Sequence, residues 1–223
     1  MGRTNPCLSG FLRVHCRFAS IRVNSRLISP ILKDRLHCVR SKYPLLRFDR
    51  MIIDPAIESG GLRVVFHWRG DRYRHTIERR IEGEWQPVFE SVEGPSDDEW
   101  PPSPVLQTVH FENRPNGPVA LLVGMAGKSH WSASVEALST ESCFQFDVAC
   151  RIQQTLQYLG STYRPCACEA EPILSIATEP EEAACELTMH EGASLWRIRP
   201  IEVALEYPAT VRWRYTTRLN AMK

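Results

Sequence analysis

A group of polar side chains between residues 110 and 151 is the part of this sequence whose residue types could do chemistry. It contains two histidines, two acids, an arginine and two serines, each beside an apolar neighbour in the chain. Such alternation places side chains on one face of a β-sheet. Histidine and carboxylate groups can transfer protons, so this face could do acid–base work. The predicted binding face is therefore His110, Glu112, His130, Ser132, Ser134, Asp147 and Arg151.

Four predicted strands carry these residues, and short turns join them. The strands cover residues 105–114, 119–125, 129–138 and 143–152. Asn116-Gly117 and Ala126-Gly127 are predicted to form the first two turns of an antiparallel meander. Trp131 then faces the core. The turns imply three rows on the opposite face: His110, Val123, His130 and Arg151; then Glu112, Leu121, Ser132 and Ala149; then Arg114, Val119, Ser134 and Asp147.

The second predicted strand is apolar on both sides, which is unusual for a strand with one face in water. Val119, Leu121 and Val123 interrupt the polar face. A strand that is apolar on both sides indicates cover on both sides. We therefore expect a loop, another sheet or a ligand to line this face.

The predicted geometry disfavours metal binding and nucleophilic catalysis. His110 and His130 flank one strand, about 10 Å apart, which is too far for a shared metal ion. Ser134 and His130 are four residues apart on one strand, about 13 Å, so no direct hydrogen bond joins them. We expect a non-catalytic domain that binds a small molecule or a protein partner, with no metal and no cofactor. The alternative is a small enzyme that uses His130 and Asp147 as acid–base groups.

The rest of the acidic part of the chain also has a period of two. Gly70-Asp71 is predicted to join strands 62–69 and 73–81, with Arg63 opposite Glu78. Pro87 lacks a backbone donor, so strand 85–92 is predicted to be an edge. Gly94–Pro104, with four prolines, is predicted to be a loop.

The last third of the chain predicts one helix and a closing hairpin. Thr178 and Glu181 form a capping box around Pro180, which indicates a short helix near 179–190 that ends at Gly192. Strands near 195–207 and 211–218 would pair with each other. The whole pattern predicts an all-β fold of about nine strands, either an antiparallel sandwich or a partly open barrel.

The basic residues are concentrated at the start of the chain. Of 27 basic and 26 acidic residues, eleven and two lie in residues 1–50, which leaves 16 and 24 for residues 51–223. We interpret 1–50 as outside the fold, either an over-long start with Met51 as the internal one or a processed segment. A transit peptide and a nucleic-acid arm are alternatives. Residues 51–223 then form a single all-β domain.

Cysteine usage and hydropathy bear on the compartment. No apolar stretch is long enough for a membrane span, and no secretory signal is recognisable. Five cysteines remain after residue 50, an odd number that argues against a disulfide framework. Cys166 and Cys168, with Cys185 and His190, would be an irregular zinc site, and a simple loop is the preferred interpretation. These features predict a cytoplasmic protein without a membrane partner, and the acidic body disfavours nucleic acid as a partner.

Three segments carry a resemblance to known sequences. They are Ser129–Glu136 (SHWSASVE), Phe146–Arg151 (FDVACR) and Gly160–Tyr163 (GSTY). Together they resemble a group of uncharacterised bacterial β-rich proteins of planctomycete type, over residues 62–165 at most. The resemblance implies a bacterial, cytoplasmic setting, and it implies no activity, cofactor or site residue.

Overall fold

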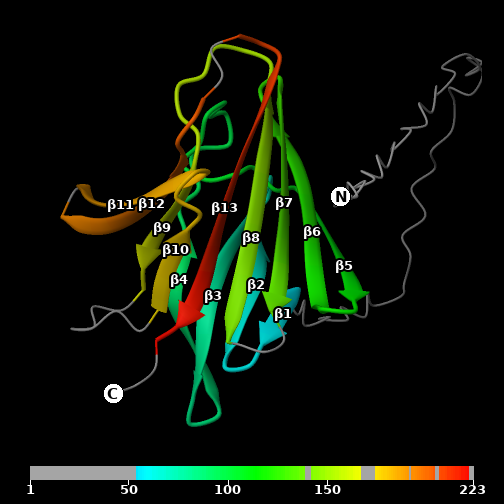
Figure 1. The fold of residues 1–223 in the computed structure, drawn as a ribbon, viewed down its shortest axis with the longest axis vertical. Helices are drawn as coiled ribbons and strands as arrows, with labels where there is room; N and C mark the ends of the chain where they lie inside the picture. The colour runs from blue at the N-terminus through cyan, green and yellow to red at the C-terminus, as the bar shows by residue number, and fades with distance from the viewer. Residues whose placement is uncertain (1–53, 139–141, 167–173, 191, 204–205, 221–223) are drawn as a thin grey trace, which may run out of the picture. The chain divides into compact units, whose positions relative to one another are not determined.

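The computed structural model describes residues 54–138, 142–166, 174–190, 192–203 and 206–220. These residues form thirteen strands in two antiparallel sheets (Figure 1). The all-β prediction is therefore confirmed, as a sandwich of more strands than the nine expected. The described residues contain no helix, and so none that could cross a membrane. The predictions for residues 1–50 and for Cys168 lie outside the described residues.

Seven strands form the first sheet, here called sheet A. Their spatial order is β1-β2-β3-β4-β9-β12-β11. Their bounds are β1 Ala56–Ser59, β2 Leu62–Trp68, β3 Tyr73–Ile81, β4 Glu84–Ser91, β9 Ser161–Pro165, β12 Ala193–Pro200 and β11 Ala183–His190. The predicted pairing of β2 with β3 is confirmed, including Arg63 opposite Glu78.

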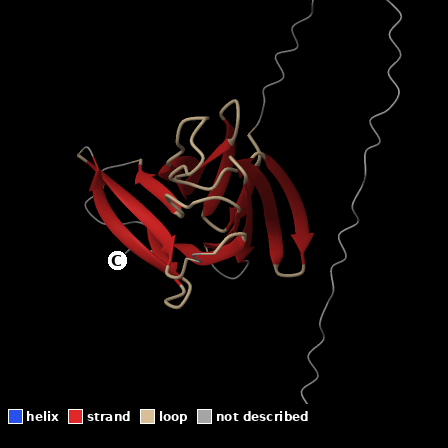
Figure 2. Cartoon of the chain, turned by 90° about the horizontal axis from the view of Figure 1, so that it is seen from above, coloured by secondary structure: helices blue, strands red, loops and turns tan. Residues whose placement is uncertain are grey.

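Six strands form the second sheet, sheet B, in the order β10-β13-β8-β7-β6-β5. Their bounds are β10 Leu174–Thr178, β13 Ala209–Leu219, β8 Cys143–Ile152, β7 Ser129–Leu138, β6 Gly117–Ala126 and β5 Thr108–Arg114. The predicted meander is thus β5 to β8, and its strand order is confirmed. Seen from above, the described chain consists of strands joined by loops (Figure 2).

Aromatic side chains fill the space between the sheets. Phe146 of β8 stacks on Tyr215 of β13 with ring centroids 4.8 Å apart. Tyr163 of sheet A reaches Tyr215 of sheet B, and their hydroxyl oxygens are 2.7 Å apart. Trp131 is buried in this core, as the alternation in β7 predicts, whereas His130 beside it is exposed. Aromatic burial of this kind stabilises the contact between the two sheets.

The predicted helix near 179–190 is wrong. The backbone NH groups of Glu182 and Ala183 donate to the carbonyl of Glu179, which closes one turn only. Residues 183–190 then form β11 and pair with β12 along all eight positions. Gly192 (φ +79°) belongs to the hairpin turn instead of ending a helix. Pairing with a distant strand therefore overrides a local capping signal.

Two predictions about strand neighbours are also wrong. The closing hairpin does not form, because β12 pairs with β9 and β11, whereas β13 pairs with β8 and β10. Strand β4 is not an edge, since it lies between β3 and β9. However, β9 pairs with β4 only at Phe89–Ser91, so Pro87 lies in the part of β4 that has one partner. The missing donor of proline is tolerated there.

Candidate binding face of sheet B

The outer face of the meander keeps the predicted β7–β8 register. His130 lies opposite Arg151, Ser132 opposite Ala149, and Ser134 opposite Asp147. The two preceding registers are shifted. The first turn is Pro115-Asn116 because Arg114 pairs with Gly117, and the second is Gly127-Lys128 because Ala126 pairs with Ser129. When a turn moves by one residue, the partner of every residue on its two strands changes by two positions.

This shift divides the predicted binding face into three groups. His130, Ser132 and Arg151 stay together at one end of the face. His110 pairs with Leu121, which pairs with Ser134, so it joins the row of Ser134 and Asp147. Glu112 lies farther along, opposite Val119. His110 and His130 are therefore even farther apart than the sequence predicts.

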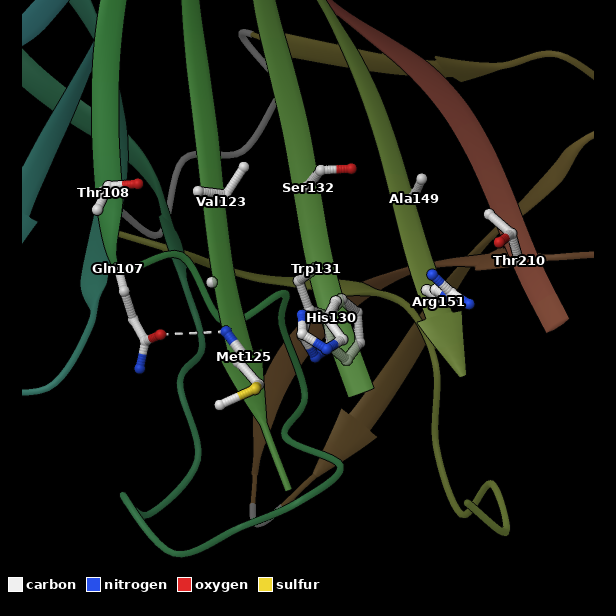
Figure 3. A pocket seen from close by; sticks show the side chains of 11 residues that line it. Gln107, Thr108, Val123, Met125, His130, Trp131, Ser132, Ala149, Arg151 and Thr210 are labelled. Carbon is white, nitrogen blue, oxygen red and sulfur yellow. Dashed lines mark hydrogen bonds between the residues drawn. The ribbon is translucent and has the colours of Figure 1, made fainter. Parts of the chain in front are cut away.

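The first group lines an open groove of about 470 Å³. Figure 3 shows His130 between Met125 and Arg151 in one row, with Val123, Ser132 and Ala149 in the next. The lining also includes Gln107, Thr108 and Thr210. The volume is in the range of small-molecule sites, although an open groove covers only one side of a ligand.

Gly124 lets the chain approach this groove closely. A Cβ atom at Gly124 would lie 2.1 Å from the carbonyl oxygen of Val105, so no other residue fits there. The backbone NH of Gln107 donates to the carbonyl of Val123, and the Gln107 side chain accepts from the NH of Met125 (Figure 3). These bonds fix the wall of the groove on the β5 side.

The apolar residues of β6 become more exposed toward the groove. Val119 is fully buried, Leu121 is half-buried, and Val123 and Met125 are 54% and 49% exposed. The expected cover on this face is therefore present at the start of β6 and absent at the groove end, within the described residues. Exposed apolar side chains beside polar ones are a feature of binding surfaces.

His130 and Arg151 have no acidic partner among the described residues. They occupy directly opposed positions, so their Cβ atoms are about 5 Å apart. Two cationic side chains in this arrangement repel each other whenever the histidine is protonated. An anion between them would remove that repulsion and accept hydrogen bonds from both.

Asp147, by contrast, already has partners. Arg212 binds it through two nitrogens, and an Arg214 nitrogen lies 3.5 Å from its carboxylate. The bond to Asp147 raises the pKa of Arg212. Asp147 also lies four positions along β8 from Arg151, which is opposite His130. That spacing is about 13 Å, so Asp147 and His130 are not placed for joint acid–base work.

Polar network on sheet A

The outer face of sheet A carries a hydrogen-bonded network that sequence reasoning missed. Asp54 accepts from Nδ1 of His67 at 2.6 Å, and Nε2 of His67 is 3.0 Å from the Thr76 hydroxyl. Thr76 in turn donates to Glu78, which binds Arg63 at 2.6 Å. The signal was available, because the confirmed β2–β3 register places His67 diagonally beside Thr76.

The hydrogen bonds that link Asp54, His67 and Thr76 have the connectivity of a catalytic triad, but their geometry does not favour Thr76 as a nucleophile. The Thr76 hydroxyl is buried and its single proton is directed at Glu78, so that proton is not directed at His67. A base that activates a nucleophile must receive that proton. The network therefore binds its own members together and leaves no group free for a substrate.

Under this network lies a second group of buried polar side chains. His75 is buried, and its Nε2 is 2.8 Å from the Tyr163 hydroxyl. Burial lowers the pKa of His75 to about 4 and raises the pKa of Glu93 to about 7. Ser91 donates to Glu93 and accepts from the backbone NH of His75. The interior thus favours a neutral histidine and a neutral acid.

The described residues hold no group of three histidine, cysteine or acidic side chains that could bind a metal ion. Of the residues weighed for zinc, Cys166 and Cys185 are free thiols. Burial raises the pKa of both, which disfavours the thiolate that a metal requires.

Comparisons with known proteins give no assignment. No protein-family model matches the chain, and searches of curated proteins and of solved structures find no significant match. The resemblance to planctomycete-type proteins therefore stays a prediction.

Proposed function

We propose that the protein is a non-catalytic binding domain whose groove on sheet B takes a small amphipathic anion. The oxyanion head, a carboxylate or a phosphate, lies between His130 and Arg151. The apolar body of the ligand rests on Val123 and Met125. Ser132, Thr108 and Thr210 at the edge of the groove offer hydroxyl groups for orientation.

One observation supports this proposal above the others. His130 and Arg151 are opposed on neighbouring strands, beside exposed apolar residues, and lack an acid among the described residues. Elsewhere, Arg63, Arg74 and Arg212 each hold a carboxylate. An arginine that has no acidic partner in the described part of the chain is available to an external oxyanion, which it can bind in a bidentate manner.

A ligand screen by thermal shift on the full chain tests the proposal. Hexanoate and hexyl phosphate are the probes, and they distinguish the two possible heads. Hexanol lacks the charge and acetate lacks the apolar body. Binding to the folded state raises the midpoint of unfolding by mass action. We expect a rise with at least one amphipathic anion and none with hexanol or acetate at equal concentration.

A matched pair of variants makes the screen specific. Arg151→Gln removes the cation in the groove, and Arg69→Gln removes an exposed cation from the β2–β3 turn. The rise should disappear in the first and persist in the second. A rise of equal size in wild type and Arg151→Gln, or no rise with either probe, contradicts the proposal.

The alternatives fit the described residues less well. An enzyme that uses His130 and Asp147 needs the two groups within reach of one substrate atom, and they lie on separate rows. Nucleic-acid binding through residues 1–50 concerns residues outside the described part of the chain. The bacterial, cytoplasmic setting is part of the proposal and rests on the sequence resemblance alone.

A further inference from the structure

Strand β11 differs from the other edge strands of the two sheets. It has eight residues, compared with four in β1, five in β10 and seven in β5. Strand β5 is guarded by the charged pair Glu112–Arg114, a known way of blocking sheet extension. An unguarded edge offers backbone donors and acceptors to another strand.

The inward side of β11 is apolar and extends past the core. Leu187 lies opposite Trp196, which lies opposite the buried Tyr163, so Leu187 is on the core-facing side of sheet A. Leu187 and Met189 are nevertheless 59% and 68% exposed. Figure 1 shows the β11–β12 hairpin extending away from the other strands of both sheets. The last residues of β11 therefore combine exposed apolar side chains with a strand edge that has no partner strand among the described residues.

We propose that β11 pairs antiparallel with β11 of a second copy of this chain, with the twofold axis at Thr188. This register places Leu187 against Met189 of the second copy and Glu186 against its His190. Apolar residues thus meet on one face, and an acid meets a histidine on the other. The five residues Glu186–His190, at the end of β11 next to its hairpin turn, match themselves about Thr188, which an isologous dimer requires and a different partner does not. The seven-stranded sheets would join into one continuous sheet. This inference is independent of the groove.

The oligomeric state of the full chain, measured by sedimentation equilibrium over a concentration series, tests the inference. Wild type should form a dimer. Leu187→Lys places a charge on the paired edge and should weaken dimerisation roughly a hundredfold. Ile201→Lys, at a residue that is 52% exposed outside β11, is the matched control and should leave the dimer intact. Circular dichroism checks that each variant is folded.

A charge exchange tests the register. Glu186 and His190 are four residues apart on one strand, about 13 Å, so they can pair only between copies. Glu186→Lys or His190→Glu alone should raise the dissociation constant about fivefold. The double variant should restore the wild-type value, because each new lysine then faces a glutamate. A monomeric wild type, a dimer unaffected by Leu187→Lys, or a double variant no tighter than the singles would overturn the proposal.

Discussion

The outer faces of the two sheets use similar residues in different ways. On sheet A three basic side chains have acid partners: Arg63 binds Glu78, Arg74 binds Glu90, and His67 binds Asp54. On sheet B, Asp147 takes two arginines, and His130 and Arg151 are left without an acid in the described part of the chain. Charges that are already paired stabilise the fold, whereas unpaired charges beside apolar surface are available for a ligand. The number of polar residues on a face is therefore a poorer guide to function than whether their charges are matched.

The largest expected effect tests whether the groove end of sheet B is open. Val119→Asp places a charge at a fully buried position and should destabilise the protein by about 3–5 kcal/mol. Val123→Asp, two rows along at a position 54% exposed, should change stability by less than about 0.5 kcal/mol. Urea denaturation of both variants gives the comparison. An equally severe loss in Val123→Asp would mean that the groove is covered.

A pH series sharpens the comparison, because His75 and Glu93 in the interior have pKa values that are shifted in opposite directions. The pKa of His75 is about 4 in the folded protein and 6.5 ordinarily. Its contribution to the free energy of unfolding is therefore full above pH 6.5 and is lost as the pH falls toward 4. The pKa of Glu93 is about 7 in the folded protein and 4.5 ordinarily. Its contribution to the free energy of unfolding is therefore full below pH 4.5 and is lost as the pH rises toward 7. Each amounts to about 3 kcal/mol, and the two oppose each other in the shared interval.

Substitution of either group should therefore reveal the other. Relative to wild type, Glu93→Gln should lose stability as the pH falls from 6.5 to 4.5, because the loss caused by His75 is no longer offset by a gain from Glu93. His75→Gln should lose stability as the pH rises over the same interval. Guanidinium denaturation at both pH values measures these differences, in which the other carboxylates cancel. Parallel pH profiles for the two variants would show that His75 and Glu93 do not control how stability changes with pH.

Two Arg–Glu pairs, one on each sheet, allow a direct comparison of how much a paired charge stabilises each outer face. Glu78 is buried and bonds to both Arg63 and Thr76, so Glu78→Gln should cost about 2 kcal/mol. Glu112 and Arg114 on sheet B are both more than two-fifths exposed, so Glu112→Gln should cost less than about 0.5 kcal/mol. Equal losses in the free energy of unfolding would erase the distinction between the two faces.

The smallest expected effect on stability is at Arg151. Arg151→Gln removes a cation that has no acidic partner among the described residues, so the free energy of unfolding should stay the same or rise by up to about 0.5 kcal/mol. Arg74→Gln on sheet A leaves Glu90 without its partner and should lower stability by about 1–2 kcal/mol. A clear loss at Arg151 would indicate that it holds the fold together, and the face would then resemble sheet A.

Local patterns in the sequence predicted the parts of this fold that depend on neighbouring strands. Alternation identified β7 and β8 and their register, and Gly70-Asp71 identified the β2–β3 hairpin. The helix at 179–190 failed because a capping box describes only one turn, and pairing with β12 decided the remaining residues. A one-residue error in placing Gly117 and Gly127 was enough to move His110 and Glu112 away from His130.

The candidate site was predicted in part for the same reason. His130, Ser132 and Arg151 lie on two strands with a correct register, and they remain together in the groove. The exposed Met125 and the wall at Gln107 were missed because they depend on the shifted strands. The network of Asp54, His67 and Thr76 was missed although its register was known, because hydrogen-bond partners on a polar face depend on side-chain conformation as well as spacing.

The central claim is that His130 and Arg151, which lack an acidic partner among the residues that the structure describes, hold an external anion. An NMR titration with ¹⁵N-labelled full-length protein tests it most directly. Addition of hexanoate or hexyl phosphate should shift the amide signals of Val123, Met125, His130 and Arg151, and leave those of His67 and Thr76 unchanged. Shifts that spread evenly over both sheets, or an unchanged groove with either probe, would contradict the account.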